Sequence, residues 1–386
     1  MQIVFSDAQY WGNFLPLTFT RPIAEMRCGI LTFSERWQKL LDAQHTAYIT
    51  EDYLQNKFPK PQAEESLFLV PNFIPTESVL SQIKDLKLGE ALVYEDELIA
   101  ARVDMKDFSL QQIEKMTDIT ESLTFFKRPS DLFAFNDKAI DFDFELITKG
   151  RTSQPLSETN GFLGNLENLF IEEGASIEYA TINCQKGKIY IGKNAEVMEG
   201  CNLRGPIALC NNAIFNLGAK IYGATTIGPY CKIGGEVNNI IFFGYSNKGH
   251  DGFLGNSVVG EWCNFGADTN SSNLKNNYAT VKLWNYQSKK FEDSGLQFCG
   301  LIMGDHSKTA INTQLNTGTI VGVAANIFKS GFPPNLVENF SWGGQRGDEK
   351  FNLKKAYEVA EKVMQRRNVT FSEDDQNILK WIYENY

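Results

Sequence analysis

The sequence contains only three histidines, at positions 45, 250 and 306, and His250 is best placed to move a proton. It lies in the run YSNKGHDGFLG, whose glycines and asparagine predict an irregular backbone outside the core. Imidazole is the natural general base near neutral pH. His306 is the rival base, although its place in a regular stretch favours a structural role. His45 lies just before an expected strand.

The elements that must position these histidines repeat every six residues. Aliphatic or aromatic residues occupy each sixth position in one long run, namely Ile191, Val197, Leu203, Leu209, Phe215, Ile221, Ile227 and Ile233. This period fits neither a helix nor a flat strand, but it fits a solenoid whose coils have three faces of six residues. Ile191, Leu209 and Ile227 should then stack on one face. We therefore expect a left-handed parallel β-helix of hexapeptide repeats.

Breaks in this repeat indicate loops, and such loops on solenoids tend to carry sites. The regularity is lost at Gly234-Gly235 and again between residues 268 and 298, and it returns at Met303. His250 and His306 each flank an irregular segment. Two solenoid histidines cannot supply the three-histidine metal site of the carbonic anhydrases that share this solenoid, so no metal site is expected.

Four regions are expected along the chain. Residues 1–150 alternate strands with helices, for example at 34–41 and 76–86, which favours a Rossmann-like α/β domain. The polar segment 151–168 is interpreted as a linker, and residues 169–340 as the solenoid. Residues 341–386 should form helices, over 351–367 and 372–384, that cap the open end of the solenoid.

Composition limits the partners and the compartment. A net charge of −10 argues against a broad nucleic-acid surface. No stretch approaches the roughly 20 apolar residues of a membrane span, and the N-terminus has no signal-peptide pattern, so a cytoplasmic protein is expected. The seven cysteines lack CxxC spacing, which favours free structural thiols over disulfides or metal ligands.

The segment from Lys248 to Asn273, KGHDGFLGNSVVGEWCNFGADTNSSN, resembles a known acetyltransferase domain. It is similar to the GH-x-x-Y-x-G…N-x-GAGT…N run of the bifunctional N-acetylglucosamine-1-phosphate uridylyltransferase/glucosamine-1-phosphate acetyltransferases. The similarity spans roughly residues 170–340. It implies an acetyl-CoA-dependent acetyltransferase acting on an amino-sugar phosphate in nucleotide-sugar biosynthesis, by either N- or O-acetylation. It also implies a homotrimer with sites between neighbouring subunits.

The resemblance assigns roles to particular residues. His250 would be the catalytic base that takes a proton from the sugar amine as it attacks the acetyl thioester. The backbone at Ala267 would contact the acetyl-CoA end and stabilise the oxyanion. Asn264 and Asn273 match asparagines that contact the sugar or position the acetyl group, although Asn264 could instead belong to an asparagine stack at a solenoid corner. Phe253 replaces a family tyrosine, which leaves the acceptor open.

In that family, basic residues bind the sugar phosphate. The candidates here are Arg204, Lys232, Lys248, Lys275 and Lys282. Lys282 fits the family's lysine best.

The N-terminal region resembles sugar nucleotidyltransferases, whose Gly-rich loop wraps the nucleotide phosphates. This chain keeps the run LPLTFTRP but has DAQYWGN in place of that loop, and Ile23 at the usual lysine position. Asp7 and Arg21 are the candidate nucleotide-binding residues. Mg²⁺, with Asp7 and Asp104 as ligands, is expected only if this domain is active. The replaced Gly-rich loop and the missing lysine favour a domain that binds its ligand weakly or regulates rather than catalyses.

Two alternatives to the single acetyltransferase stay open. The chain could be bifunctional and also form a nucleotide sugar from a sugar-1-phosphate and a nucleoside triphosphate. It could also be a non-catalytic regulatory or assembly subunit, because similar domain fusions occur in such roles.

Overall fold

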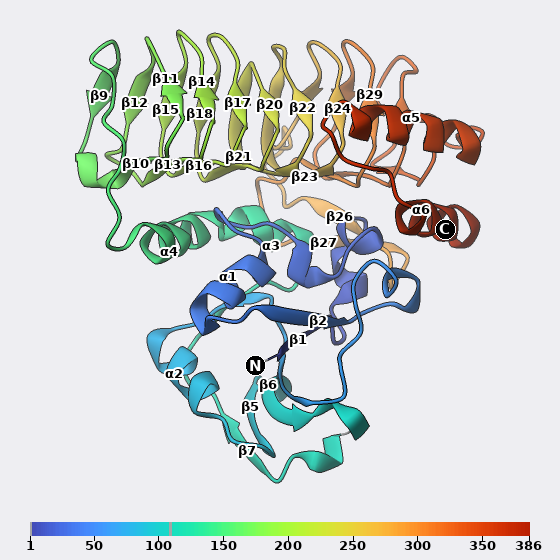
Figure 1. Ribbon diagram of the computed structural model, residues 1–386. Helices are drawn as coiled ribbons and strands as arrows, with labels where there is room; N and C mark the ends of the chain where they lie inside the picture. The colour runs from blue at the N-terminus through green and yellow to red at the C-terminus, as the bar shows by residue number, and fades with distance from the viewer. Residues whose placement is uncertain (1, 108–109) are drawn as a thin grey trace.

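A computed structural model describes residues 2–107 and 110–386. An α/β domain lies beneath a long β-solenoid, and helices follow the solenoid at the C-terminus (Figure 1). This is the expected order of elements, and the fold prediction is confirmed. Within the described ranges, no helix combines the length and the apolar character needed to cross a membrane. The cytoplasmic location stays a prediction.

The N-terminal domain is built on a mixed sheet with the strand order β2-β1-β3-β6-β5-β7. Its strands are β1 (Gln2–Ser6), β2 (His45–Ile49), β3 (Glu65–Leu69), β5 (Glu90–Tyr94), β6 (Glu97–Asp104) and β7 (Lys115–Asp118). Strand β1 is parallel to β2 and β3, whereas β6 is antiparallel to β3 and β5. A separate small pair joins β4 (Phe73–Ile74) to β8 (Thr124–Phe125).

Capped helices surround this sheet. Helix α1 (Phe33–Leu41) begins with a capping box in which Thr32 and Glu35 bond each other's backbone N–H. Helix α2 (Glu77–Asp85) begins at the Thr76 cap, as expected. Two further helices, α3 (Pro129–Ala134) and α4 (Asn136–Thr148), lie between the sheet and the solenoid (Figure 1).

The solenoid has three faces of stacked parallel strands. The first face contains β10 (Leu169–Ile171), β13 (Ile189–Ile191), β16 (Ile207–Leu209), β19 (Thr225–Ile227), β28 (Leu301–Met303), β31 (Thr319–Val321) and β33 (Leu336–Val337). The second face contains β11 (Ser176–Ile177), β14 (Glu196–Val197), β17 (Ile214–Phe215), β20 (Lys232–Ile233), β22 (Asn247–Lys248), β24 (Asn264–Phe265), β29 (Lys308–Thr309), β32 (Asn326–Ile327) and β34 (Trp342–Gly343).

The third face contains β9 (Gly161–Leu163), β12 (Thr181–Asn183), β15 (Asn202–Arg204) and β18 (Lys220–Tyr222), followed by the pair β25 (Asn270–Ser271) and β30 (Gln314–Leu315). The long strands β21 (Glu236–Gly244) and β23 (Phe253–Glu261) continue from this face into the first. Strand β9 pairs with β12, so the stacking already begins within the segment expected to be a linker.

The predicted stacking of residues is confirmed. Ile191 pairs with Leu209, and Leu209 pairs with Ile227, and all three side chains are fully buried. The period shortens next, because Ile233 pairs with Lys248 across the Gly234-Gly235 break. His250 lies immediately after this shortened coil.

The second break contains a hairpin that reaches back to the N-terminal domain. Strands β26 (Lys282–Asn285) and β27 (Lys290–Asp293) pair in antiparallel fashion. Leu283, Trp284 and Tyr286 join the apolar cluster that fills the N-terminal domain. The insertion therefore helps to join the two domains.

The C-terminal helices lie beside the last coils of the solenoid (Figure 1). They are α5 (Leu353–Gln365) and α6 (Glu373–Asn385). Trp381 of α6 stacks on Tyr53 of the N-terminal domain, with 3.7 Å between ring centroids. Arg367, just after α5, donates a hydrogen bond to Asn247 of the solenoid at 3.1 Å. The Arg367 contact holds the end of α5 against the second face, and the Trp381 contact holds α6 against the N-terminal domain.

Candidate functional site

A cavity of about 680 Å³ lies between the second face of the solenoid and the end of α5. His250, Asn264, Ala267 and Lys232 all line it. These four residues come from three coils, because Asn264 and Ala267 lie close together on one coil, and the stacking of the coils brings them together. We refer to this space as the His250 cavity.

A polar row forms one wall of the His250 cavity. Lys232 pairs with Asn247, Asn247 with Asn264, and Asn264 with Lys308, so their side chains project from successive coils. Neighbouring strands in such a sheet are about 4.8 Å apart. Asn264 is exposed and lies on the flat face, beside Asn247, and not at a corner. The row can offer both donors and acceptors to a ligand.

The His250 cavity is electropositive although the chain as a whole is acidic. Lys232, Lys308, Arg366 and Arg367 line it, and the described residues of its wall include no aspartate or glutamate. Burial lowers the pKa of Lys308 to about 8, which still leaves the ammonium mostly charged at neutral pH. A cavity with this lining favours an anionic ligand.

Two residues predicted from the sequence to act in catalysis, His250 and Ala267, both line the His250 cavity. The His250 side chain is exposed, on the turn that follows β22. The carbonyl of Ala267 accepts from Asn312 N at 2.8 Å, while its N–H has no hydrogen-bond partner in the described part of the chain. An imidazole and a free backbone N–H in one cavity are the pair that acyl transfer requires.

Three of the predicted substrate-binding residues lie elsewhere. Asn273 donates to Asn256 at 2.8 Å and does not line the His250 cavity. Lys282 lines a second cavity of about 650 Å³, together with Lys275 and Arg346. Arg204 is exposed on the third face of the solenoid.

His306 lies at a corner of the solenoid and lines a different cavity of about 280 Å³. Its ring continues a ladder of aromatic side chains and stacks on Trp262, 6.3 Å away. Burial, assisted by the charge of Lys308, lowers the pKa of His306 to about 3. The imidazole is therefore neutral at physiological pH. The structural role expected for it stays a prediction.

Both candidate nucleotide-binding residues are engaged within the protein. The buried Asp7 carboxylate accepts from Ile23 N at 2.8 Å and from the Thr50 hydroxyl. Burial raises the pKa of Asp7 to about 7. Arg21 is paired with Asp305 and, at 3.1 Å, with Glu261, both on the solenoid. Burial opposes the charge of Arg21, but these carboxylates outweigh it and raise its pKa.

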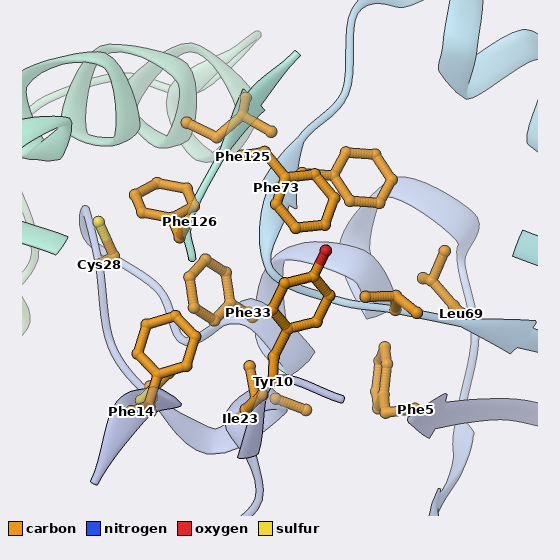
Figure 2. Packing of buried hydrophobic residues seen from close by; sticks show 14 of the residues in the cluster. Phe5, Tyr10, Phe14, Ile23, Cys28, Phe33, Leu69, Phe73, Phe125 and Phe126 are labelled. Carbon is orange, nitrogen blue, oxygen red and sulfur yellow. The ribbon is translucent and has the colours of Figure 1, made fainter. Parts of the chain in front are cut away.

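The segment in place of the Gly-rich loop is anchored by aromatic side chains. Tyr10 points into the core beside the stacked rings of Phe73 and Phe125, and Phe14, just after the segment, packs beside Phe33 (Figure 2). The Tyr10 hydroxyl also donates to Glu97. A loop held by buried rings differs from one whose backbone amides face a phosphate.

The proposed Mg²⁺ ligands do not meet. Asp7 follows the carboxyl end of β1, whereas Asp104 pairs with Glu65 near the amino end of β1. The two ends of this five-residue strand are about 17 Å apart. Across the described residues, no group of His, Cys, Asp or Glu side chains is arranged to hold a metal ion.

Sequence reasoning missed several residues of the His250 cavity. The cavity is also lined by Lys308, Arg366 and Arg367, and by Asn216 from the coil that precedes Lys232. The register of the polar row would have found Lys308 once the length of the insertion was known. The arginines became part of the site only through the docking of α5.

Comparisons with known proteins agree with this architecture. Residues 2–152 match the family described as sugar nucleotidyl transferase. A bifunctional sugar-1-phosphate nucleotidylyltransferase/acetyltransferase of Sulfurisphaera tokodaii is 30% identical over 145 residues, which are 37% of this chain and 36% of that protein. The bifunctional protein GlmU of Methanocaldococcus jannaschii is 37% identical over 87 residues, which are 22% of this chain and 21% of that protein.

The matched region thus spans about a third of the length of the first relative and about a fifth of the second. The family match covers the N-terminal domain and ends before the first strand of the solenoid. The chain joins a sugar nucleotidyl transferase domain to a β-solenoid, and its distant homologues are GlmU-like bifunctional sugar nucleotidyltransferase/acetyltransferases.

Proposed function

We propose that this chain transfers an acetyl group from acetyl-CoA to an amino-sugar phosphate in the His250 cavity. The observation that supports this proposal most directly is that one electropositive cavity is lined by His250, Ala267, Asn264 and Lys232. The name of the Sulfurisphaera tokodaii relative, a bifunctional nucleotidylyltransferase/acetyltransferase, supports this class of reaction.

The proposed chemistry needs a base and an oxyanion donor. His250 removes a proton from the acceptor amine as the amine nitrogen bonds to the acetyl carbon. The Ala267 N–H donates to the carbonyl oxygen while that oxygen carries negative charge. The C–S bond then breaks, and the leaving thiolate of CoA receives the proton from His250.

The basic lining supports phosphate-bearing reactants. Lys232 and Lys308 flank the polar row, and Arg366 faces it from the end of α5. Both the donor and an amino-sugar phosphate carry phosphate groups, which arginine and lysine bind through charge-assisted hydrogen bonds.

For the N-terminal domain we propose a docking role in place of nucleotidyl transfer. Asp7 and Arg21 are bonded within the protein, and buried rings hold the loop between them. The bifunctional alternative would require Arg21 to leave a buried ion pair before it could meet a nucleotide.

We also propose the homotrimer that the family resemblance implies. Asn273 and Lys282 lie outside the His250 cavity of their own chain, and a trimer would give them a route to a neighbouring site. Mixing an H250A chain with a K282A chain tests this arrangement. If the mixed oligomers regain activity, the result supports sites shared between subunits. If they do not, either both residues serve a site within one chain or Lys282 takes no part in the site.

The decisive assay measures thiol release from acetyl-CoA with a panel of amino-sugar phosphates that includes glucosamine-1-phosphate. We expect release with at least one acceptor and a loss of about 100-fold or more in H250A. Pyrophosphate release from UTP or another triphosphate with a sugar-1-phosphate would instead favour the bifunctional alternative. A folded, oligomeric protein with neither activity would favour a regulatory or assembly role.

A further inference from the structure

Lys248 occupies a buried position for which the coils on either side have the apolar residues Ile233 and Phe265. It is paired with Ile233 in the apolar column of the second face, and Phe265 belongs to the same column. The Lys248 side chain is only 1% exposed. Burying an ammonium group is strongly unfavourable unless hydrogen bonds or opposite charges compensate it.

The ammonium of Lys248 bonds to backbone on both sides of the shortened coil. Its Nζ donates to Gly234 O at 3.0 Å and to His250 O at 2.7 Å. Burial lowers the pKa of Lys248 to about 8, against the opposing charges of Asp251 and Asp268. The group is therefore mostly an ammonium at neutral pH and has donors for both carbonyls.

These bonds belong to a frame that holds the whole turn. The carbonyl oxygens of residues 249–252 all accept hydrogen bonds. Side chains hold the first two, since Asn216 Nδ2 lies 2.8 Å from Gly249 O and Lys248 Nζ holds His250 O. The other two accept from backbone N–H groups of neighbouring coils, at 3.0 and 3.1 Å.

Close packing of backbone reinforces this frame. Gly252 has φ +113°, and a Cβ there would lie 2.3 Å from Thr269 O on the next coil. The turn therefore has little freedom, whereas the His250 imidazole at its tip is exposed. The direction of the ring depends on where this backbone is held.

We propose that Lys248 is a positioning residue that fixes the backbone of His250 from inside the solenoid. This inference rests on the proposed function, because it explains why the base needs a fixed place. Lys248 cannot itself touch the substrate, since its Nζ lies in the core. An apolar side chain would fill the column without the cost of a buried charge, so stability alone does not explain a lysine here.

The test compares K248M with the control I233M, which changes a neighbouring residue of the same column. Methionine is an unbranched, apolar side chain only slightly shorter than lysine, and it donates no hydrogen bond. We expect K248M to unfold at a denaturant concentration equal to or above that of the wild type. We expect its kcat for acetyl transfer to fall about 10- to 100-fold, with KM for acetyl-CoA within about twofold. I233M should keep the wild-type kcat.

A second readout does not depend on catalysis. With only three histidines, the ring signals in ¹⁵N-resolved NMR spectra can be assigned with H250A. K248M should shift or broaden the His250 signal and leave the His45 signal unchanged, and I233M should change neither. K248Q, whose shorter amide keeps a donor, should fall between wild type and K248M, and it serves if K248M fails to fold.

The outcomes separate the two proposals. An unchanged His250 signal and kcat in K248M would overturn the positioning role while leaving the proposed function intact. A loss of stability in K248M that matches its loss of kcat would mark a merely structural lysine. If the wild type transfers no acetyl group but K248M still shifts the His250 signal, the proposed function fails and the positioning role stands.

Discussion

Arg21 of the N-terminal domain and Asp305 of the solenoid form a buried ion pair across the junction of the two domains. Nη1 of Arg21 lies 3.2 Å from Oδ1 of Asp305, and the two side chains are 6% and 4% exposed. The Thr20 hydroxyl donates to the same carboxylate at 2.8 Å. Arg21, predicted from the sequence as a candidate nucleotide-binding residue, therefore faces the solenoid.

Removing the arginine should destabilise the junction strongly. R21M leaves Asp305 buried without its partner, and such changes cost about 3–5 kcal/mol. The double variant R21M/D305N removes both charges and should recover much of the loss. Urea-induced unfolding followed by fluorescence measures both effects.

The exposed pair of Lys115 and Glu90 provides the control for this experiment. K115M should change the unfolding midpoint far less than R21M, because surface ion pairs contribute little. Equal effects of K115M and R21M would show that the interdomain pair does not hold the junction.

The pH dependence of stability should report the carboxyl group of Asp7. Its pKa in the folded protein is about 7, against 3.8 in an unfolded chain, because the group is buried. The folded state then binds more protons between these values, so this group's contribution to stability falls as pH rises from about 4 to 7.

The variant D7N keeps an acceptor for Ile23 N and cannot ionise. Near pH 4 its stability should be close to that of the wild type, and at pH 8 it should be the more stable by a few kcal/mol. Urea midpoints at pH 5 and pH 8 provide the comparison. A difference between the proteins that stays the same at both values would show that Asp7 is ionised throughout.

Much of the solenoid could be predicted because its signal is local. Each coil must bury residues at fixed spacing, so the run from Ile191 to Ile233 reveals the faces directly. The start of the solenoid at β9 was not predicted, because Gly161–Leu163 is largely exposed and lacks the apolar pattern. Helices α3 and α4 were not recognised either, although both pack between the domains.

The His250 cavity was predictable only on the side formed by the solenoid. The motif around His250 identified residues on consecutive coils, which the stacking places together. The arginines after α5 were not predictable, because nothing in their spacing relates them to residues more than a hundred positions earlier. The hairpin that carries Lys282 was likewise decided by tertiary packing, since Trp284 and Tyr286 attach it to the N-terminal domain.

The apolar column offers a stability test with a matched control. Leu209 is fully buried between Ile191 and Ile227, whereas Leu217 on a nearby turn is 68% exposed. L209A should cost about 2–5 kcal/mol through lost burial and a cavity. L217A should change stability by no more than about 0.5 kcal/mol. Similar losses for the two variants in urea unfolding would contradict the assignment of the column.

Arg366 should bind the phosphate end of the acetyl donor if the proposed function is correct. It lines the His250 cavity from the end of α5, and its side chain is exposed to incoming ligand. A charge-assisted hydrogen bond contributes about 1.5–3 kcal/mol, so R366A should raise the Kd for CoA by about 10- to 100-fold. Calorimetric titration of the full chain with CoA measures this change.

Lys362 provides the control, because it carries the same charge on the same helix but does not line the cavity. K362A should leave the Kd for CoA unchanged. Acetyl-pantetheine, which has the thioester arm without the nucleotide phosphates, should bind wild type and R366A equally. Equal losses of CoA affinity in R366A and K362A would point to a general field effect, whereas loss of acetyl-pantetheine binding in R366A would place Arg366 at the thioester end of the cavity.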